Sequence, residues 1–475
     1  MKFHTGTVWA ALGALLVLAY LGLRLASKSF GYEFELLDMP ILWFVAIYTS
    51  LVAVFTLTLL YLIPATPAKS TNLVFLLVLS VGLMARITQF GAEPVLEDDY
   101  QRYLWDGAVT SAGLSPYTHA PAAILDSTVT DPEFVALKVL AGQVLERVNN
   151  PELRTVYLPV AQLGFALAHK IKPFSLDAWR LVLLLAELAS LVAIIGILRS
   201  LGRSILWVSL YWWHPLVIKE VANSAHMEPL LMAPVLIGAY LAMRHKPVLS
   251  AGVFALAAAV KIWPAGLIVV LIAQVWRKPY RLVAMTVVFT LIMAVSIWPI
   301  VQSGLDQSSG FVAFARDWSA SSAAFLMANY LVGLLPTIGS DPTIAPVATR
   351  LLLGAAMVVS IAALWVKSAH RNDTVLLRIF FIVAALYIFS PSQTPWYFLW
   401  VAPFLCFFPV RGLCLAGITI SLHYLFFHMA PRGFADAYRQ GVVWLIWVPV
   451  WVVLVYDLVK QPSQTTKGPG TENVG

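Results

Sequence analysis

Apolar runs of about 17–25 residues recur along almost the whole chain. A run of this length is what a helix needs to cross the ~30 Å hydrocarbon core of a bilayer. Of the 475 residues, 60% are hydrophobic and 12% are charged, whereas a typical soluble domain is about 25% charged. The sequence therefore predicts an all-α polytopic membrane protein.

Twelve runs are candidate spans: 7–25, 41–63, 72–90, 177–198, 205–221, 228–243, 281–301, 343–366, 374–390, 396–410, 413–428 and 442–457. Between Pro247 and Trp276, two apolar halves flank Lys261 and Pro264, and proline interrupts helices. We expect a pair of short or broken helices there, with a tip that lines a polar cavity. The count is about 12–14 crossings. Residues 1–460 are predicted to form one membrane unit, and residues 461–475 a disordered cytoplasmic tail.

Basic residues gather in short clusters between the spans, as is typical of cytoplasmic connections, so the net charge of +7 does not indicate nucleic-acid binding. The clusters contain Lys69, Arg199, Arg203, Arg244, Lys246, Arg277, Lys278, Arg281, Lys367, Arg371, Arg411 and Lys460. Placing them inside puts five connections outside: 91–159, 222–227, 302–323, 390–395 and 430–440. For the spans to alternate between the two sides in this way, residues 157–169 must be interfacial or re-entrant. We expect a multi-pass protein of the inner or plasma membrane.

The 91–159 connection is the longest polar segment between the spans and holds ten of the 24 acidic residues. It opens with Glu97-Asp98-Asp99-Tyr100, just after an apolar run. Neighbouring carboxylates repel one another, so a function that needs negative charge or a proton acceptor is indicated. Further on, Asp131-Pro132-Glu133 begins a short helical pattern, which we expect to lie on the membrane surface.

Asp98 and Asp99 are the candidate general base, and the sequence does not separate them. A carboxylate at the mouth of a membrane cavity can accept a proton from an attacking hydroxyl. If the leaving group is a phosphate, it departs as a stable anion and no acid partner is needed. The alternative is that the acidic run caps a loop helix at its positive dipole end.

Two more segments place costly ionisable groups in apolar surroundings. Lys219, Glu220, His226 and Glu228 follow one span, where His226 is a candidate phosphate ligand; the alternative is a structural Lys219–Glu220 pair with an exposed histidine. Lys261 is the best phosphate-binding candidate, with snorkelling to the headgroups as its alternative. Glu187, in the middle of a span, is expected to be a structural partner of a polar group.

Residues 390–397 lead into an aromatic helix start, where Gln393, Trp396 and Tyr397 are candidates for a sugar-stacking platform. Tryptophan and tyrosine also favour the membrane interface without any ligand. The chain contains no Walker loop, Rossmann glycines, zinc spacing or serine elbow. Cys406 and Cys414 suggest neither a disulfide framework nor a metal site. We therefore predict no cofactor and no metal.

Four motifs follow one another along the chain: Glu97-Asp98-Asp99-Tyr100-x-Arg102-Tyr103-x-Trp105-Asp106-Gly107, continued by Gly113-x-x-Pro116-Tyr117 and Pro121; His214-Pro215 through Glu220 to His226-x-Glu228; Lys261-x-x-Pro264; and Ser390-Pro391 to Pro395-Trp396-Tyr397. In this order they resemble bacterial glycosyltransferases of the GT-C type. The nearest group is glycosyltransferase family 87 with the related polyprenyl-phosphate-mannose-dependent α-mannosyltransferases. His214 and Glu228 depart from that pattern, which has Asn and Asp there.

The resemblance implies a GT-C-like fold with a large first extracytoplasmic loop that carries short interfacial helices and the catalytic residues. It implies inverting transfer of a sugar, mannose first among the candidates, from a polyprenyl-phosphate donor to an extracytoplasmic glycan or glycolipid. By similarity, Asp98 or Asp99 is the base, and Lys261, Arg102 and His226 hold the donor phosphate. Other substrate contacts are expected from Glu97, Tyr100, Glu220, Glu228, Gln393, Trp396 and Tyr397.

The alternative function is a transporter or flippase of lipid-linked saccharides, which also needs many spans and buried charge. Such a protein is expected to show paired broken helices in two related halves. The sequence contains one such break and no convincing internal repeat. An enzyme that works at the outer membrane face is therefore the favoured interpretation.

Overall fold

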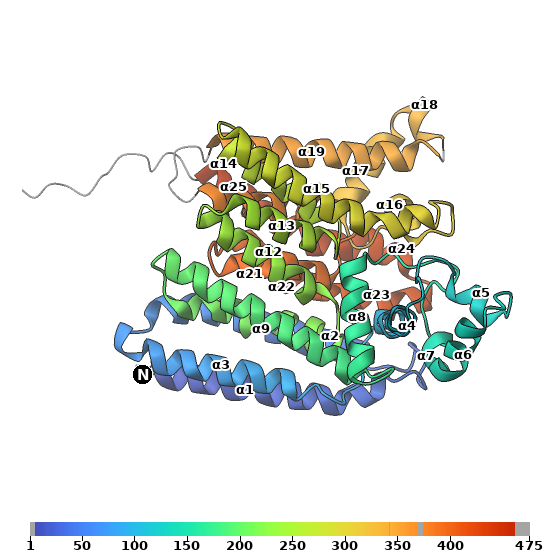
Figure 1. Cartoon of the computed structure of the whole chain (residues 1–475). Helices are drawn as coiled ribbons and strands as arrows, with labels where there is room; N and C mark the ends of the chain where they lie inside the picture. Colours follow the sequence, from blue (N-terminus) through green and yellow to red (C-terminus); the bar gives the residue numbers. More distant parts are fainter. Residues whose placement is uncertain (1–4, 342, 368–373, 461–475) are drawn as a thin grey trace, which may run out of the picture.

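The computed structural model describes residues 5–341, 343–367 and 374–460 (Figure 1). These residues fold almost entirely into helices; among them there is no strand, and one isolated bridge joins Ala320 and Ser392. The all-α prediction is confirmed. The predicted tail, residues 461–475, and the predicted cytoplasmic Arg371 lie outside the described residues.

Eight of the described helices or helix runs are long and apolar enough to cross a membrane. They are α1 (Thr5–Ala26) with its extension to Phe30, α2 (Ile41–Ala65), α3 (Thr71–Ile87) with the preceding turn, α9 (Leu176–Ser200), α15 (Pro279–Gln302), α19 (Ala345–Lys367), and two runs at Arg411–Arg432 and Ala435–Lys460. Shorter apolar helices include α12 (Glu228–Met243), α13 (Pro247–Ala258), α17 (Ala323–Gly333) and α20 (Thr374–Phe389). The chain is a multi-pass membrane protein.

Three segments are broken rather than continuous. Between α13 and α14 (Ile268–Val275), residues 259–262 leave the helix, and a 3-10 turn, η5 (Trp263–Leu267), follows with Pro264 as its second residue. The predicted helix break is therefore present. Two predicted spans are also broken, which the sequence analysis did not anticipate. Residues 205–223 form η3 (Ile205–Val208), α10 (Ser209–Trp212), α11 (Pro215–Ile218) and a π-helical turn, η4 (Lys219–Asn223), while η6 (Pro395–Trp400) and α21 (Ala402–Leu405) replace 396–410. Proline is the first residue of α11 and η6 and the second residue of η5 and α21, and it lacks the N–H that would continue a helix.

The polar segment 91–159 folds into a small helical cap at one end of the bundle, on the right in Figure 1. It comprises α4 (Asp99–Ser111), α5 (Pro121–Leu125), α6 (Pro132–Ala141) and α7 (Gln143–Glu146), followed by α8 (Pro159–Ile171). Trp105, Ile124, Phe134 and Leu145 form its buried core. The predicted helix start at 131 is confirmed, because the Asp131 side chain accepts a hydrogen bond from the Glu133 N–H and Pro132 occupies the first turn.

The position of α4 is fixed by close contact with α8. A Cβ added at Gly107 would lie 2.5 Å from the backbone oxygen of Phe165, so a larger residue would push the two helices apart. Tyr103 stacks on the Phe165 ring with centroids 4.8 Å apart. The glycine of the first motif is therefore required by packing, which sets the direction of the helix that begins at Asp99.

An ion pair deep in the bundle joins α3 to α9. The Arg86 guanidinium donates from Nε to Glu187 Oε2 at 2.6 Å and from Nη2 to Glu187 Oε1 at 2.5 Å, and it lies 3.6 Å from the ring centroid of Trp212. Both charged side chains are at most 1% exposed. The structural role expected for Glu187 is confirmed.

Replacing one partner of this pair should strongly destabilise the protein, because it leaves the other charge buried and unpaired. We expect Glu187→Ala to lower the free energy of unfolding by roughly 3–5 kcal/mol, measured by steric trapping or thermal unfolding in detergent. The control is Asp317→Ala, which breaks an Arg316–Asp317 pair that is about half exposed and should cost less than about 1 kcal/mol. Equal effects of the two variants would refute this account.

Candidate active site

A cavity of about 750 Å³ opens between the cap and the ends of the bundle helices. Its walls come from the α1–α2 connection, residues 93–103 and 149–158, the turn around Lys261, α16 (Gly310–Asp317) and η6. Most of the lining is apolar and aromatic, with a few charged groups. This combination is typical of a site for an organic ligand.

A set of side-chain hydrogen bonds brings the acidic run next to the second motif. Asn223 accepts from the Val95 N–H at 2.9 Å and donates to the backbone oxygen of Glu93 at 2.9 Å. Arg180 Nη2 donates to the backbone oxygens of Ala92 at 2.8 Å and Asn223 at 2.9 Å. These bonds hold residues 92–95 against residue 223, although the two segments are far apart in sequence.

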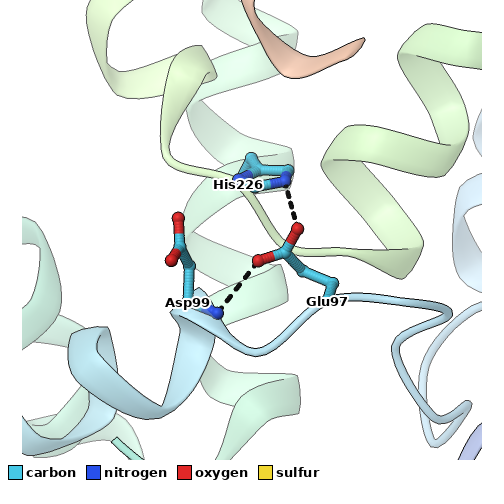
Figure 2. A group of neighbouring side chains, drawn as sticks. All are labelled: Glu97, Asp99 and His226. Carbon is cyan, nitrogen blue, oxygen red and sulfur yellow. Dashed lines mark hydrogen bonds and ion pairs between the residues drawn. The ribbon is translucent and has the colours of Figure 1, made fainter. Parts of the chain in front are cut away.

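Glu97 and His226 meet as a result (Figure 2). His226 Nε2 lies 2.8 Å from Glu97 Oε2 and 3.3 Å from Glu220 Oε2. The other oxygen of Glu97, Oε1, accepts from the backbone N–H groups of Asp98 at 3.1 Å and Asp99 at 2.9 Å. Glu97 therefore provides the helix cap that was the alternative role of the acidic run. The carboxylates of Asp98 and Asp99 do not serve as this cap.

His226 is buried and stacks on Trp396, with ring centroids 4.3 Å apart. Burial alone would lower its pKa, but the charge of Glu97 and the contacts with Glu97 and Glu220 raise the pKa to about 10. The ring is therefore an imidazolium at neutral pH. Behind it, Glu220 is fully buried, accepts from the Tyr424 hydroxyl and lies 3.4 Å from Lys219 Nζ.

One amide joins the two aspartates. Asn149 Nδ2 donates to Asp98 Oδ1 at 2.9 Å and to Asp99 Oδ1 at 2.6 Å. Asp98 opens onto the cavity but is surrounded by protein; this enclosure and the charges of Glu97 and Asp99 raise its pKa to about 7. Burial and Glu97 also raise the pKa of Asp99, against the opposing effects of His226, Asn149 and Lys261.

Lys261 supplies the main cationic group on the wall of the cavity near η6. Its Nζ lies 2.5 Å from Glu228 Oε1 and 4.7 Å from the ring centroid of Tyr397. The lysine side chain is 21% exposed and Glu228 is 1% exposed, so the ammonium remains open to the cavity. It can therefore take a second anionic partner without leaving the first.

Other residues of the first motif build the cap. Arg102 donates to the backbone oxygens of Asn149, Asn150 and Leu153 at 2.8–3.0 Å. Its terminal nitrogens are thus engaged, and the guanidinium supports the turn that carries Asn149. Arg102 also lines the cavity, and its contact with a phosphate stays a prediction. Asp106 accepts from Thr155 and Gln162 and ties α4 to the start of α8.

The remaining predicted substrate contacts divide into two groups. Tyr100, Trp396, Tyr397, Glu97 and Glu228 line the cavity. Glu220 lies behind His226. Gln393 is fully buried and donates to the backbone oxygens of Tyr387 and Ile388, so its amide terminates α20 instead of forming part of an open platform.

Several cavity residues were missed by the sequence analysis. Asn149 lies in an Asn-Asn-Pro turn that carries a turn signal but no chemical one. Tyr32 and Phe34 belong to the short α1–α2 connection, and Phe311 and Phe314 to α16. Aromatic residues in membrane connections are common, so nothing in the pattern separates these four from ordinary interface residues.

Glu97, Asp99 and His226 are the one group among the described residues whose potential ligand atoms lie within 4.8 Å of one another, as a metal ion would require. A ligating histidine must be neutral, whereas His226 carries a proton between two carboxylates. A cation there would have to displace that proton and break the ion pair with Glu97. The positive charge at this point is already provided by the imidazolium.

The Asp98 carboxyl should titrate close to pH 7, far above an exposed aspartate. Isotope-edited infrared spectroscopy of the purified protein should show this carboxyl band, and Asp98→Asn should remove it. Asn149→Ala should move the midpoint up by about one pH unit, because a hydrogen bond to the charged form is lost. Asp341→Asn, at a site that does not line the cavity, is the control that should leave the band unchanged. A midpoint near pH 4 in the native protein would contradict this geometry.

Comparison with known proteins gives one match. Residues 156–391 match the family model described as Glycosyltransferase family 87; the matched part includes His226, Glu228 and Lys261 and begins after the acidic run. No curated protein and no solved structure matched the chain. The chain is thus a multi-pass membrane protein that contains a glycosyltransferase family 87 domain, and this domain makes it a membrane glycosyltransferase.

Proposed function

We propose that the protein transfers a sugar, with mannose as the first candidate, from a polyprenyl-phosphate donor to a glycan or glycolipid acceptor outside the cytoplasm. The donor, the sugar and the catalytic base all belong to this proposal. It is carried by one observation: a pair of aspartates and an open lysine lie on the walls of the same cavity. The cavity thus offers a proton acceptor and a cationic contact for phosphate together.

Asp98 or Asp99 acts as the general base in the proposed reaction. The carboxylate takes the proton of the acceptor hydroxyl while its oxygen attacks C1 of the sugar, and the bond from C1 to the phosphate oxygen breaks. A pKa of about 7 for Asp98 suits this role, because a base works best when its pKa lies near the working pH. A single displacement of this kind inverts the configuration at C1.

Lys261, with His226 close behind Glu97, is the proposed contact for the donor phosphate. Charge-assisted bonds from an ammonium or imidazolium to phosphate are among the stronger polar contacts in proteins. Near Lys261, Trp263, Phe311 and Phe314 add apolar lining that suits a prenyl chain. Fixing donor and acceptor in one cleft converts an encounter of two molecules into a step within a complex, which can supply much of the rate.

The direction of the helices supports an extracytoplasmic site. Glu228, at the start of α12, lines the cavity, and the 16 residues of α12 carry the chain roughly 24 Å away from it. Arg244 and Lys246 follow at that far end. Because basic connections favour the cytoplasm, the cavity belongs on the opposite side of the plasma or inner membrane.

A flippase of lipid-linked saccharides is the competing function. The family match favours the enzyme. Sugar-dependent flux without formation of a glycosidic bond would favour the flippase.

The double variant Asp98→Asn/Asp99→Asn should lose transfer by at least about 10²-fold, the usual contribution of a general base. The assay follows transfer of radiolabel from polyprenyl-phosphate mannose in membranes that contain the full chain. The two single variants show which carboxylate carries the reaction. Asp341→Asn is the control for loss of one acidic group. Undiminished transfer by the double variant would refute the assignment of the base.

Transfer should not depend on a divalent metal. We expect EDTA treatment followed by gel filtration to change the rate by less than about twofold, since protonated His226 is ion-paired with Glu97, and these are two of the three groups that could hold a metal. The same assay with added Mg²⁺ or Mn²⁺ should give no increase. Loss of activity on chelation that is restored by either ion would instead assign Glu97, Asp99 and His226 to a metal.

A further inference from the structure

The cavity has two chemically different sides, which meet at the aspartate pair. One side is built around Lys261, Glu228 and Tyr397. The other is the α1–α2 connection, from which Tyr32, Phe34, Leu36 and Met39 face the cavity. No motif of the sequence analysis includes this connection.

Tyr32 is adjacent to the Asp98 end of the pair. The Arg147 guanidinium lies 4.4 Å from the centroid of the Tyr32 ring, and the Tyr32 hydroxyl lies 3.5 Å from the backbone oxygen of Arg147. Two residues further along the chain, Asn149 donates to Asp98. Asn149 also donates to Asp99, and Tyr32, Asn149 and Asp98 all line the cavity. The turn at residues 147–149 thus joins the α1–α2 connection to the aspartate pair.

Charge makes the Tyr32 side unsuitable for a phosphate. The α1–α2 connection carries three exposed carboxylates, Glu33, Glu35 and Asp38, and Glu93 also lines the cavity. Two nearby cations are already engaged: Arg147 packs against Tyr32, and Arg432 donates to the backbone oxygens of Leu37 and His428. An anionic donor would be repelled here, whereas a neutral polyhydroxylated molecule would meet acceptors for its hydroxyl groups.

The aromatic rings on this side are available to a ligand. Tyr32 is 45% exposed and Phe34 is 44% exposed, although both belong to the cavity lining. Arginine covers one face of the Tyr32 ring, and the exposed remainder can pack against the C–H face of a sugar ring. Asn149 and Asn150 lie at the cavity wall nearby, and amide groups can both donate to and accept from hydroxyls.

We propose that the α1–α2 connection forms the acceptor subsite, in which a neutral saccharide packs on Tyr32 and points its attacking hydroxyl at Asp98. This inference rests on the proposed function. The acceptor O–H proton passes to the Asp98 carboxylate, the acceptor oxygen bonds to C1, and the electron pair of the broken C1–O bond leaves with the polyprenyl phosphate on the Lys261 side. The two substrates thus approach the aspartates from opposite walls.

The test separates the two substrates kinetically, with the full chain in lipid nanodiscs. Radiolabelled polyprenyl-phosphate mannose is the donor, and octyl α-mannoside is the acceptor probe. Tyr32→Ala should raise the KM for the octyl mannoside about tenfold, the loss expected for one stacked ring, and should leave the donor KM within about twofold. Lys261→Ala should do the reverse.

Two controls separate the ring from a general effect on the fold. Tyr32→Phe keeps the ring and should keep the acceptor KM within about twofold. Tyr61→Ala removes a tyrosine that is 78% exposed on α2, about 30 Å along the helix from its cavity end, and should change neither KM. An unchanged acceptor KM in Tyr32→Ala, or a rise confined to the donor KM, would overturn the inference.

A binding measurement without donor distinguishes failure of this inference from failure of the proposed function. Saturation-transfer NMR should detect octyl mannoside on the native protein and a weaker signal on Tyr32→Ala, with 1-octanol as the probe that lacks a sugar. If this holds and no transfer occurs, the subsite stands and the reaction fails. If transfer occurs and does not change in Tyr32→Ala, the proposed reaction is retained and the subsite is refuted. Absence of octyl mannoside binding to the native protein would also refute the subsite.

Discussion

The ion pair between His226 and Glu97 is the interaction on which the site depends. Two carboxylates, Glu97 and Glu220, approach one imidazole within 2.8 and 3.3 Å. Glu220 also has Lys219 Nζ at 3.4 Å, and the protonated ring is the cation that pairs with Glu97. Buried charges persist when they are paired, so the acidic run can enter the protein because His226 is there to receive it. Since Glu97 also accepts from the first N–H groups of α4, this single contact fixes where the helix begins.

The other contacts of α4 fix the direction of this helix. Gly107 allows contact with α8, Arg102 fixes the turn at residues 149–153, and Asp106 binds Thr155 and Gln162. Asn149 then reaches back from this turn to both aspartates. A group that must meet a substrate needs support from neighbours that do not. The motif is therefore mostly scaffold, and only its first residues open onto the cavity.

The sequence predicted the helical membrane fold and the break at Lys261, because run length and proline are local properties. It did not predict the breaks at Pro215 and near Pro395, since apolar composition alone looks the same in a broken and a continuous helix. It assigned Arg102 and Gln393 to ligands and did not predict that both bind backbone oxygens. Nothing in the sequence indicated a role for Asn149 or Tyr32, because their importance arises from contacts between segments distant in the sequence.

The charge of the cavity bears on how the proposed donor and acceptor can share it. Among the described residues that line it, five carboxylates (Glu93, Glu97, Asp98, Asp99 and Glu228) face three cations (Arg102, Arg154 and Lys261), and both arginines are engaged with backbone oxygens. Lys261, whose side chain is 21% exposed, is therefore the lining cation that remains open to the proposed donor phosphate. Burial, together with the charges of Glu97 and Asp99, raises the pKa of Asp98, and the excess of carboxylates suits a neutral hydroxylated partner. In the proposed reaction the donor phosphate and this neutral partner would therefore bind to different parts of the cavity lining.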